Sequence, residues 1–124
     1  MAENVFVLKL KDGMDIIGEL KKFAEKEEIK YGVLLGAVGK IKDFELVAFR
    51  ERGVVEKRQL KEPHELNSIS GKVQWLGGKY GAHLNIAVGE KSFKAVNGQL
   101  MHGQAAGDLE ISIRKVNLGK IIEA

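Results

Sequence analysis

Hydrophobic and polar residues alternate along most of this chain. A period of two places successive side chains on opposite faces of a strand. The alternation is strictest in residues 108–116 (DLEISIRKV), where Leu109, Ile111 and Ile113 share one face. Interrupted by glycine-containing turns, the alternation predicts about seven or eight strands, over residues 4–10, 30–41, 43–50, 54–60, 64–76, 82–88, 93–103 and 108–116.

The alternation shifts once within residues 64–76. The apolar positions there are Leu66, Ile69, Val73 and Trp75, which do not all fall on one face of a regular strand. An extra residue in one strand, a β-bulge, restores the alternation after such a shift. We expect the bulge near Gly71.

A different period marks one helix, over residues 14–28 (MDIIGELKKFAEKEE). Met14, Ile17, Leu20 and Ala24 follow helical spacing and predict one buried stripe. A single main amphipathic helix with mostly antiparallel strands predicts an α+β fold. At 124 residues, the chain is expected to form one domain, residues 1–124.

Composition narrows the classes of function. The chain has no cysteine, which excludes disulfides, thiolate zinc sites and cysteine nucleophiles. No segment is apolar enough to span a membrane, so we expect a cytoplasmic protein without a membrane partner. The net charge of +3 comes from 20 basic and 17 acidic residues that are interspersed along the chain. This mixture is typical of a solvated surface, and it leaves open whether the fold gathers the excess positive charge into a nucleic-acid-binding face.

Candidate chemistry centres on the segment GAHLNIAV, residues 81–88. His83 and Asn85 are two residues apart and lie on one face of the predicted strand. A histidine in place of Asn85 would make this pair half of a metal site, but an amide is a poor ligand for zinc.

The other two histidines, His64 and His102, are each close to the end of a predicted strand. All three are either unrelated surface histidines or part of a zinc site, and their spacing favours the former. Glu65, beside His64, opens an apolar strand. It is either a surface charge or an acid–base group, and we include it among the candidate pocket residues.

Three segments, in order, resemble the plants-and-prokaryotes conserved (PPC) domain, in its prokaryotic stand-alone form. Residues 8–46 give a strand, a turn, a helix and a glycine-bearing strand. Residues 64–75 (HELNSISGKVQW) resemble the Phe-Glu-x-x-Ser-x-Ser-Gly strand of the family. Residues 82–103 (AHLNIAVGEKSFKAVNGQLMHG) are similar to its His-Leu-His strand, short turn and Gly-Gly-His-Leu-x-x-Gly strand.

The resemblance implies an α+β fold that assembles as a homotrimer. In prokaryotic members, these strands can supply a three-histidine metal site. The matching positions here are His83, Asn85 and Gln99, so two of the three imidazoles are replaced by amides. The resemblance therefore implies a degenerate metal site, and we expect no tightly bound zinc and no other cofactor.

Members of the family are usually described as DNA-binding. In plant members, a separate Arg-Gly-Arg-Pro hook makes the DNA contact, and this sequence has no such hook. We therefore predict a homotrimeric binding or assembly protein rather than an enzyme. The alternatives are a DNA-associated regulator and a small-molecule-binding protein or enzyme that uses the pocket around His83, Asn85, Gln99 and Glu65. The small ligand or protein partner is not specified by the sequence.

Overall fold

The structure is a computed structural model that describes residues 4–49, 53 and 55–124. Its elements, in chain order, are β1 (Val5–Leu10), α1 (Ile16–Lys26), β2 (Tyr31–Phe49), β3 (Val55–Leu60), β4 (His64–Leu76), β5 (Lys79–Gly89), the short 3-10 helix η2 (Lys91–Phe93), β6 (Ala95–Lys115) and the 3-10 helix η3 (Leu118–Lys120). The α+β class is confirmed. No helix in the described part of the chain has the length and apolar character needed to cross a membrane.

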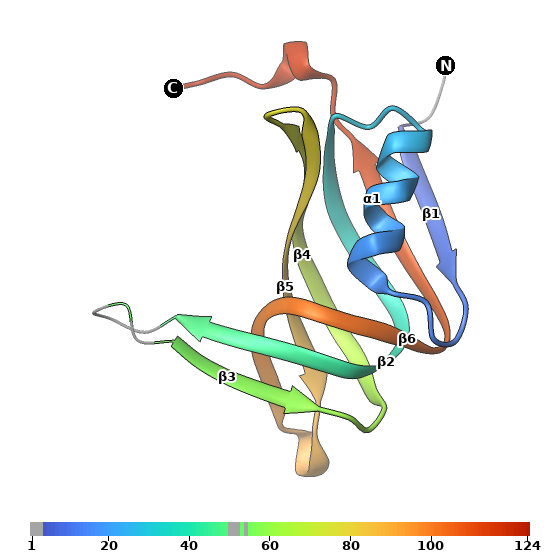
Figure 1. Cartoon of the computed structure of the whole chain (residues 1–124), viewed down its shortest axis with the longest axis vertical. Helices are drawn as coiled ribbons and strands as arrows, with labels where there is room; N and C mark the ends of the chain where they lie inside the picture. Colours follow the sequence, from blue (N-terminus) through green and yellow to red (C-terminus); the bar gives the residue numbers. More distant parts are fainter. Residues whose placement is uncertain (1–3, 50–52, 54) are drawn as a thin grey trace.

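The strands form one antiparallel sheet in the order β1-β6-β5-β4-β2-β3, and β6 also pairs with β2. The pairings β2 with β4, β4 with β5, β5 with β6 and β6 with β2 therefore close a circuit around the core. In Figure 1, α1 lies against one face of the sheet, while β3 and the end of β2 project away from the helix.

The described residues contain six strands, and the expected count of seven or eight is not confirmed. Two pairs of expected strands are continuous: β2 contains residues 31–41 and 43–49 of the first pair, and β6 contains residues 95–103 and 108–115 of the second. Glycines and bulges interrupt the alternation in these long strands without ending them. Residues 50 and 54, at the ends of two expected strands, lie outside the described residues.

The helix begins two residues later than predicted, because Asp15 caps it. The Asp15 carboxylate accepts a hydrogen bond of 2.7 Å from the backbone N–H of Gly18. Met14 consequently lies outside the helix and is exposed. The buried positions of the helix are Ile16, Leu20 and Ala24.

The bulge in β4 is at Asn67, four residues before Gly71, near which it was expected. The register against β5 shifts between Leu66 and Ser68, and from Ser68 onward the pairing is regular. Gly71 serves another purpose. Its φ is +122°, and a Cβ built there would be 1.9 Å from the carbonyl oxygen of His83. Glycine at this position allows β4 to approach β5 closely.

Asp12 holds the turn before α1 against the sheet. Its carboxylate accepts hydrogen bonds from the backbone N–H of Gly107 at 2.8 Å and from the Lys42 ammonium at 2.9 Å. These two bonds, the one from Gly107 first, lower the pKa of Asp12 below its ordinary value.

Candidate functional site

Strand β5 presents His83 and Asn85 on its outer face. The side chains of Leu84, Ile86 and Val88, on the other face of β5, are buried in the core. His83 and Asn85 are exposed on the opposite side of the strand. The burial of one face therefore fixes the direction of both candidate side chains.

A row of paired residues extends this face across four strands. Asn85 of β5 pairs with Ser70 of β4 on one side and with Gln99 of β6 on the other. Gln99 in turn pairs with Val47 of β2. Directly opposite residues in such pairs have Cβ atoms about 4.5–5.5 Å apart. The sheet thus brings Asn85 and Gln99 together, although they are 14 positions apart in the sequence.

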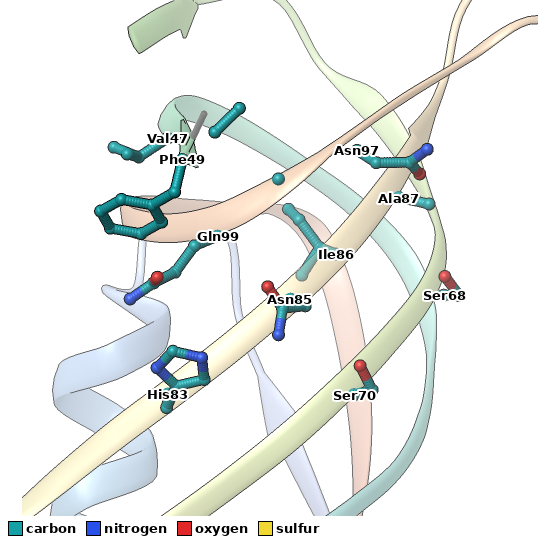
Figure 2. A pocket seen from close by; sticks show the side chains of 12 residues that line it. Val47, Phe49, Ser68, Ser70, His83, Asn85, Ile86, Ala87, Asn97 and Gln99 are labelled. Atoms are coloured by element: carbon teal, nitrogen blue, oxygen red, sulfur yellow. The ribbon is translucent and has the colours of Figure 1, made fainter. Parts of the chain in front are cut away.

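His83, Asn85 and Gln99 line one depression of about 590 Å³. Figure 2 shows the three side chains on neighbouring strands and on the same side of the sheet. The remaining lining residues are Val47, Ala48, Phe49, Ser68, Ser70, Ile86, Ala87, Asn97 and Gly98. The depression combines amides, hydroxyls and one imidazole with an apolar surface, and we call it the amide pocket.

No residue lining the amide pocket carries a formal charge when His83 is neutral. Lys72 pairs with His83 in register but does not line the pocket. Its ammonium lies 5.1 Å from the centre of the Tyr31 ring, in a cation–π geometry. The pocket therefore offers hydrogen-bond donors and acceptors to an uncharged ligand.

The structure places Glu65 elsewhere. It pairs with Lys40 near the start of β4, five residues before Ser70, which is about 17 Å along a strand. Glu65 and His64 line a different depression. His102 pairs with Glu45 and does not line the amide pocket.

The metal site that the resemblance implies does not fit the side chains present. One imidazole and two amides make a poor ligand set for zinc, which prefers histidine nitrogen, cysteine sulfur and carboxylate oxygen. Within the described residues, no group of three or more His, Cys, Asp or Glu side chains is placed to hold a metal ion.

Sequence reasoning missed Ser68, Ser70, Asn97, Val47 and Phe49 as pocket residues. Ser68 and Ser70 follow the same two-residue spacing as His83 and Asn85. This spacing was the sequence signal that could have placed the two serines on one face of a strand. Their register against β5 depends on the bulge at Asn67, which the sequence did not place.

Comparison with known proteins identifies the family. The model of the Plants and Prokaryotes Conserved domain, abbreviated PCC or PPC, matches residues 1–117. No curated protein sequence matches the chain.

Solved structures share the fold at low sequence identity. A plant- and prokaryote-conserved protein of Pyrococcus horikoshii has a TM-score of 0.79 at 20% identity, over 91% of this chain and 79% of its own. A metal-containing protein of Archaeoglobus fulgidus has a TM-score of 0.78 at 23% identity, over 90% and 78%. A Bacteroides thetaiotaomicron protein, provisionally described as DNA-binding, has a TM-score of 0.83 at 19% identity, over 94% and 82%. With the family match covering most of its length, this chain belongs to the Plants and Prokaryotes Conserved domain family.

Proposed function

We propose that this protein is a binding and assembly module, which forms a homotrimer and binds an uncharged polar ligand in the amide pocket. One observation carries the proposal. Asn85 and Gln99 are paired directly across β5 and β6, and His83 lines the same depression from the same face. Primary amides carry both a donor and an acceptor, so adjacent amides suit a ligand that offers both.

The apolar surface of the pocket supports binding of a ring-shaped ligand. Val47 and Ile86 are buried beneath it, and Phe49 is exposed at its rim. Ligand sites commonly combine an apolar surface with a few placed polar groups that fix the orientation of the ligand. Nucleosides and simple sugars have this character and carry no charge.

A thermal-shift screen with uncharged nucleosides and sugars tests the ligand proposal. A ligand of this pocket raises the melting temperature of the natural protein, because it binds the folded state. Asn85→Ala should abolish the shift. Gln59→Ala, which removes an exposed amide on β3, should leave it unchanged. A ligand that shifts the Asn85→Ala variant as strongly as the natural protein binds elsewhere and contradicts the proposal.

Self-association is supported by apolar side chains on the outer face of the sheet. Val7 of β1 and Val38 of β2 are 53% and 73% exposed. Both strands pair with β6: Val7 of β1 is opposite Ser112, and Val38 of β2 is opposite Glu110. The sheet also ends in two short edge strands, β1 and β3. Association between copies covers such surfaces.

Light scattering tests the trimer and should give a mass three times that of the chain. Val38→Lys should lower this mass, because it places an ammonium in the proposed interface. Leu76→Lys is the matched control, since Leu76 is similarly exposed, at 64%, but lies beside the turn between β4 and β5. A monomeric natural protein at micromolar concentration contradicts the trimer, and an unchanged mass for Val38→Lys contradicts this interface.

DNA association is a second candidate, which the Bacteroides thetaiotaomicron relative supports by its description. Three copies of a chain with a net charge of +3 would carry a combined excess of about nine positive charges. A gel-retardation assay on unrelated duplexes, across salt concentrations, tests it. Backbone binding should weaken steeply as salt rises. We expect no sequence-specific footprint at physiological salt, because the apolar face of α1 is buried against the core.

A further inference from the structure

A second depression, of about 670 Å³, lies where β4 begins and β5 ends. It shares no lining residue with the amide pocket. Its lining includes Lys40 of β2, His64 and Glu65 of β4, and the turn of residues 90–94 between β5 and β6. We call it the basic pocket.

The turn beside this pocket holds an aromatic ring in full contact with solvent. Phe93 is completely exposed, which is unusual for so large an apolar side chain. Ser92 and Phe93 both have left-handed backbone conformations, with φ of 62° and 61°. Two consecutive non-glycine residues in this region are strained. A hydrogen bond of 2.7 Å from the Glu90 N–H to the Lys94 carbonyl closes the turn. Packing within the described chain does not account for the position of this ring.

The charge of the basic pocket is predominantly positive. Lys40, Lys91 and Lys94 line it, and none of them has an ion pair or hydrogen bond with another described side chain. Glu90 is neutralised by Arg58, whose guanidinium nitrogen lies 2.6 Å from the carboxylate. Three lysines therefore share this pocket with one carboxylate that is outside an ion pair, that of Glu65, which is opposite Lys40 in the pairing of β4 with β2.

His64 adds an oriented hydrogen-bonding group. Its Nδ1 lies 2.8 Å from the carbonyl oxygen of Gly89, and its ring packs edge-on against Phe44 with centroids 5.7 Å apart. A carbonyl oxygen can only accept, so in the neutral ring Nδ1 carries the proton and Nε2 remains an acceptor. The ring orientation is thus fixed by the fold before any ligand arrives.

We propose that the basic pocket binds a phosphorylated planar ring, the chemistry of a mononucleotide. Phe93 stacks on the ring, because a base of any identity offers an aromatic face. Lys91 and Lys94 flank Phe93 in the sequence and hold the phosphate, with Lys40 across the pocket. The same chemistry is offered by a free nucleotide and by the 5′-phosphorylated end of a nucleic-acid strand.

Calorimetric titration at low salt tests this with AMP and inorganic phosphate. AMP should bind about tenfold or more tightly than inorganic phosphate, because it uses the ring and the lysines together. Phe93→Ala should weaken AMP by about tenfold and leave phosphate unchanged. The Lys91→Gln/Lys94→Gln variant should weaken both AMP and phosphate. Phe93 and both lysines are exposed, so these variants should retain the natural melting temperature.

Two controls and a longer probe complete the experiment. Phe49→Ala, which removes an exposed ring from the amide pocket, and Asn85→Ala should leave AMP binding unchanged. A 5′-phosphorylated deoxyadenosine hexamer that binds more tightly than AMP, and also depends on Phe93, identifies a strand end as the ligand. The proposal is overturned if AMP does not bind, if Phe93→Ala binds it as tightly as the natural protein, or if the hexamer binds and AMP does not.

Discussion

Restoring imidazoles at positions 85 and 99 should create a metal site in the amide pocket. Asn85 and Gln99 are paired across adjacent strands, and His83 is two residues from Asn85 on the same face. The first pair of Cβ atoms is expected to be about 5 Å apart and the second about 7 Å. Three imidazoles at these separations can converge on one ion and leave a fourth position for water, as zinc allows.

The size of the effect follows from mass action. Zinc at 100 times its Kd stabilises the folded state by about 2.7 kcal/mol if it binds only that state. For 124 residues, the entropy of unfolding is about 0.26 kcal/mol/K near the melting temperature. The Asn85→His/Gln99→His variant should therefore melt about 10 °C higher with zinc than without it. The shift should weaken below about pH 6.5, because the imidazoles then bind protons instead of metal.

Elemental analysis and melting curves of four proteins test whether this zinc site forms. The double variant should hold one zinc per chain, and His83→Ala in the same background should lose it. A control with histidines at two distant positions, Gln59 and Asn117, should gain no stoichiometric zinc. Absence of zinc from the double variant would show that the three side chains do not converge. Stoichiometric zinc in the natural protein would show that amides at 85 and 99 do not destroy the site.

Two further substitutions test the fold that supports the pockets. In a denaturant titration, Gly71→Ala should destabilise the protein by about 3 kcal/mol, because φ is +122° and the new Cβ would be 1.9 Å from the His83 carbonyl oxygen. The control Gly81→Ala, with nothing within 4 Å of its Cβ, should cost less than about 1 kcal/mol in the same titration. Asp12→Asn should lower the melting temperature at pH 6, and the difference from the natural protein should disappear on acidification. The pKa of Asp12 is lowered by folding, so its stabilisation is complete above about pH 4 and is lost as the pH falls through the lower folded value. A difference that persists at pH 2 would contradict this assignment.

The sequence predicted local structure well wherever one period persisted. The helix and the outward direction of His83 and Asn85 followed from spacing alone. The expected break in β2 near residue 42 was instead an irregularity. Asp43 adopts a left-handed φ of 47°, and the register against β6 shifts between Lys42 and Glu45. An irregularity interrupts the period of two just as a strand end does, so pattern alone could not distinguish them.

For a related reason, only part of the candidate site could be predicted from the sequence. His83 and Asn85 are neighbours within one strand, but Gln99 was found through the family resemblance, and Ser70 and Val47 were not found at all. Cross-strand neighbours depend on register, and register here depends on the irregularities in β2 and β4. The sequence gives no direct measure of that register.

The two pockets differ in charge, and this makes their ligands separable. Salt screens interactions between exposed charges, with a Debye length of about 10 Å at 0.1 M and about 3 Å at 1 M. AMP in the basic pocket should therefore bind more weakly as salt rises, since Lys91 and Lys94 are exposed. An uncharged ligand in the amide pocket should be nearly insensitive to the same change, because its lining carries no formal charge with His83 neutral. Titration of each ligand at the two salt concentrations measures this difference. Equal salt dependence for both ligands would contradict the assignment of separate chemistry to the two pockets.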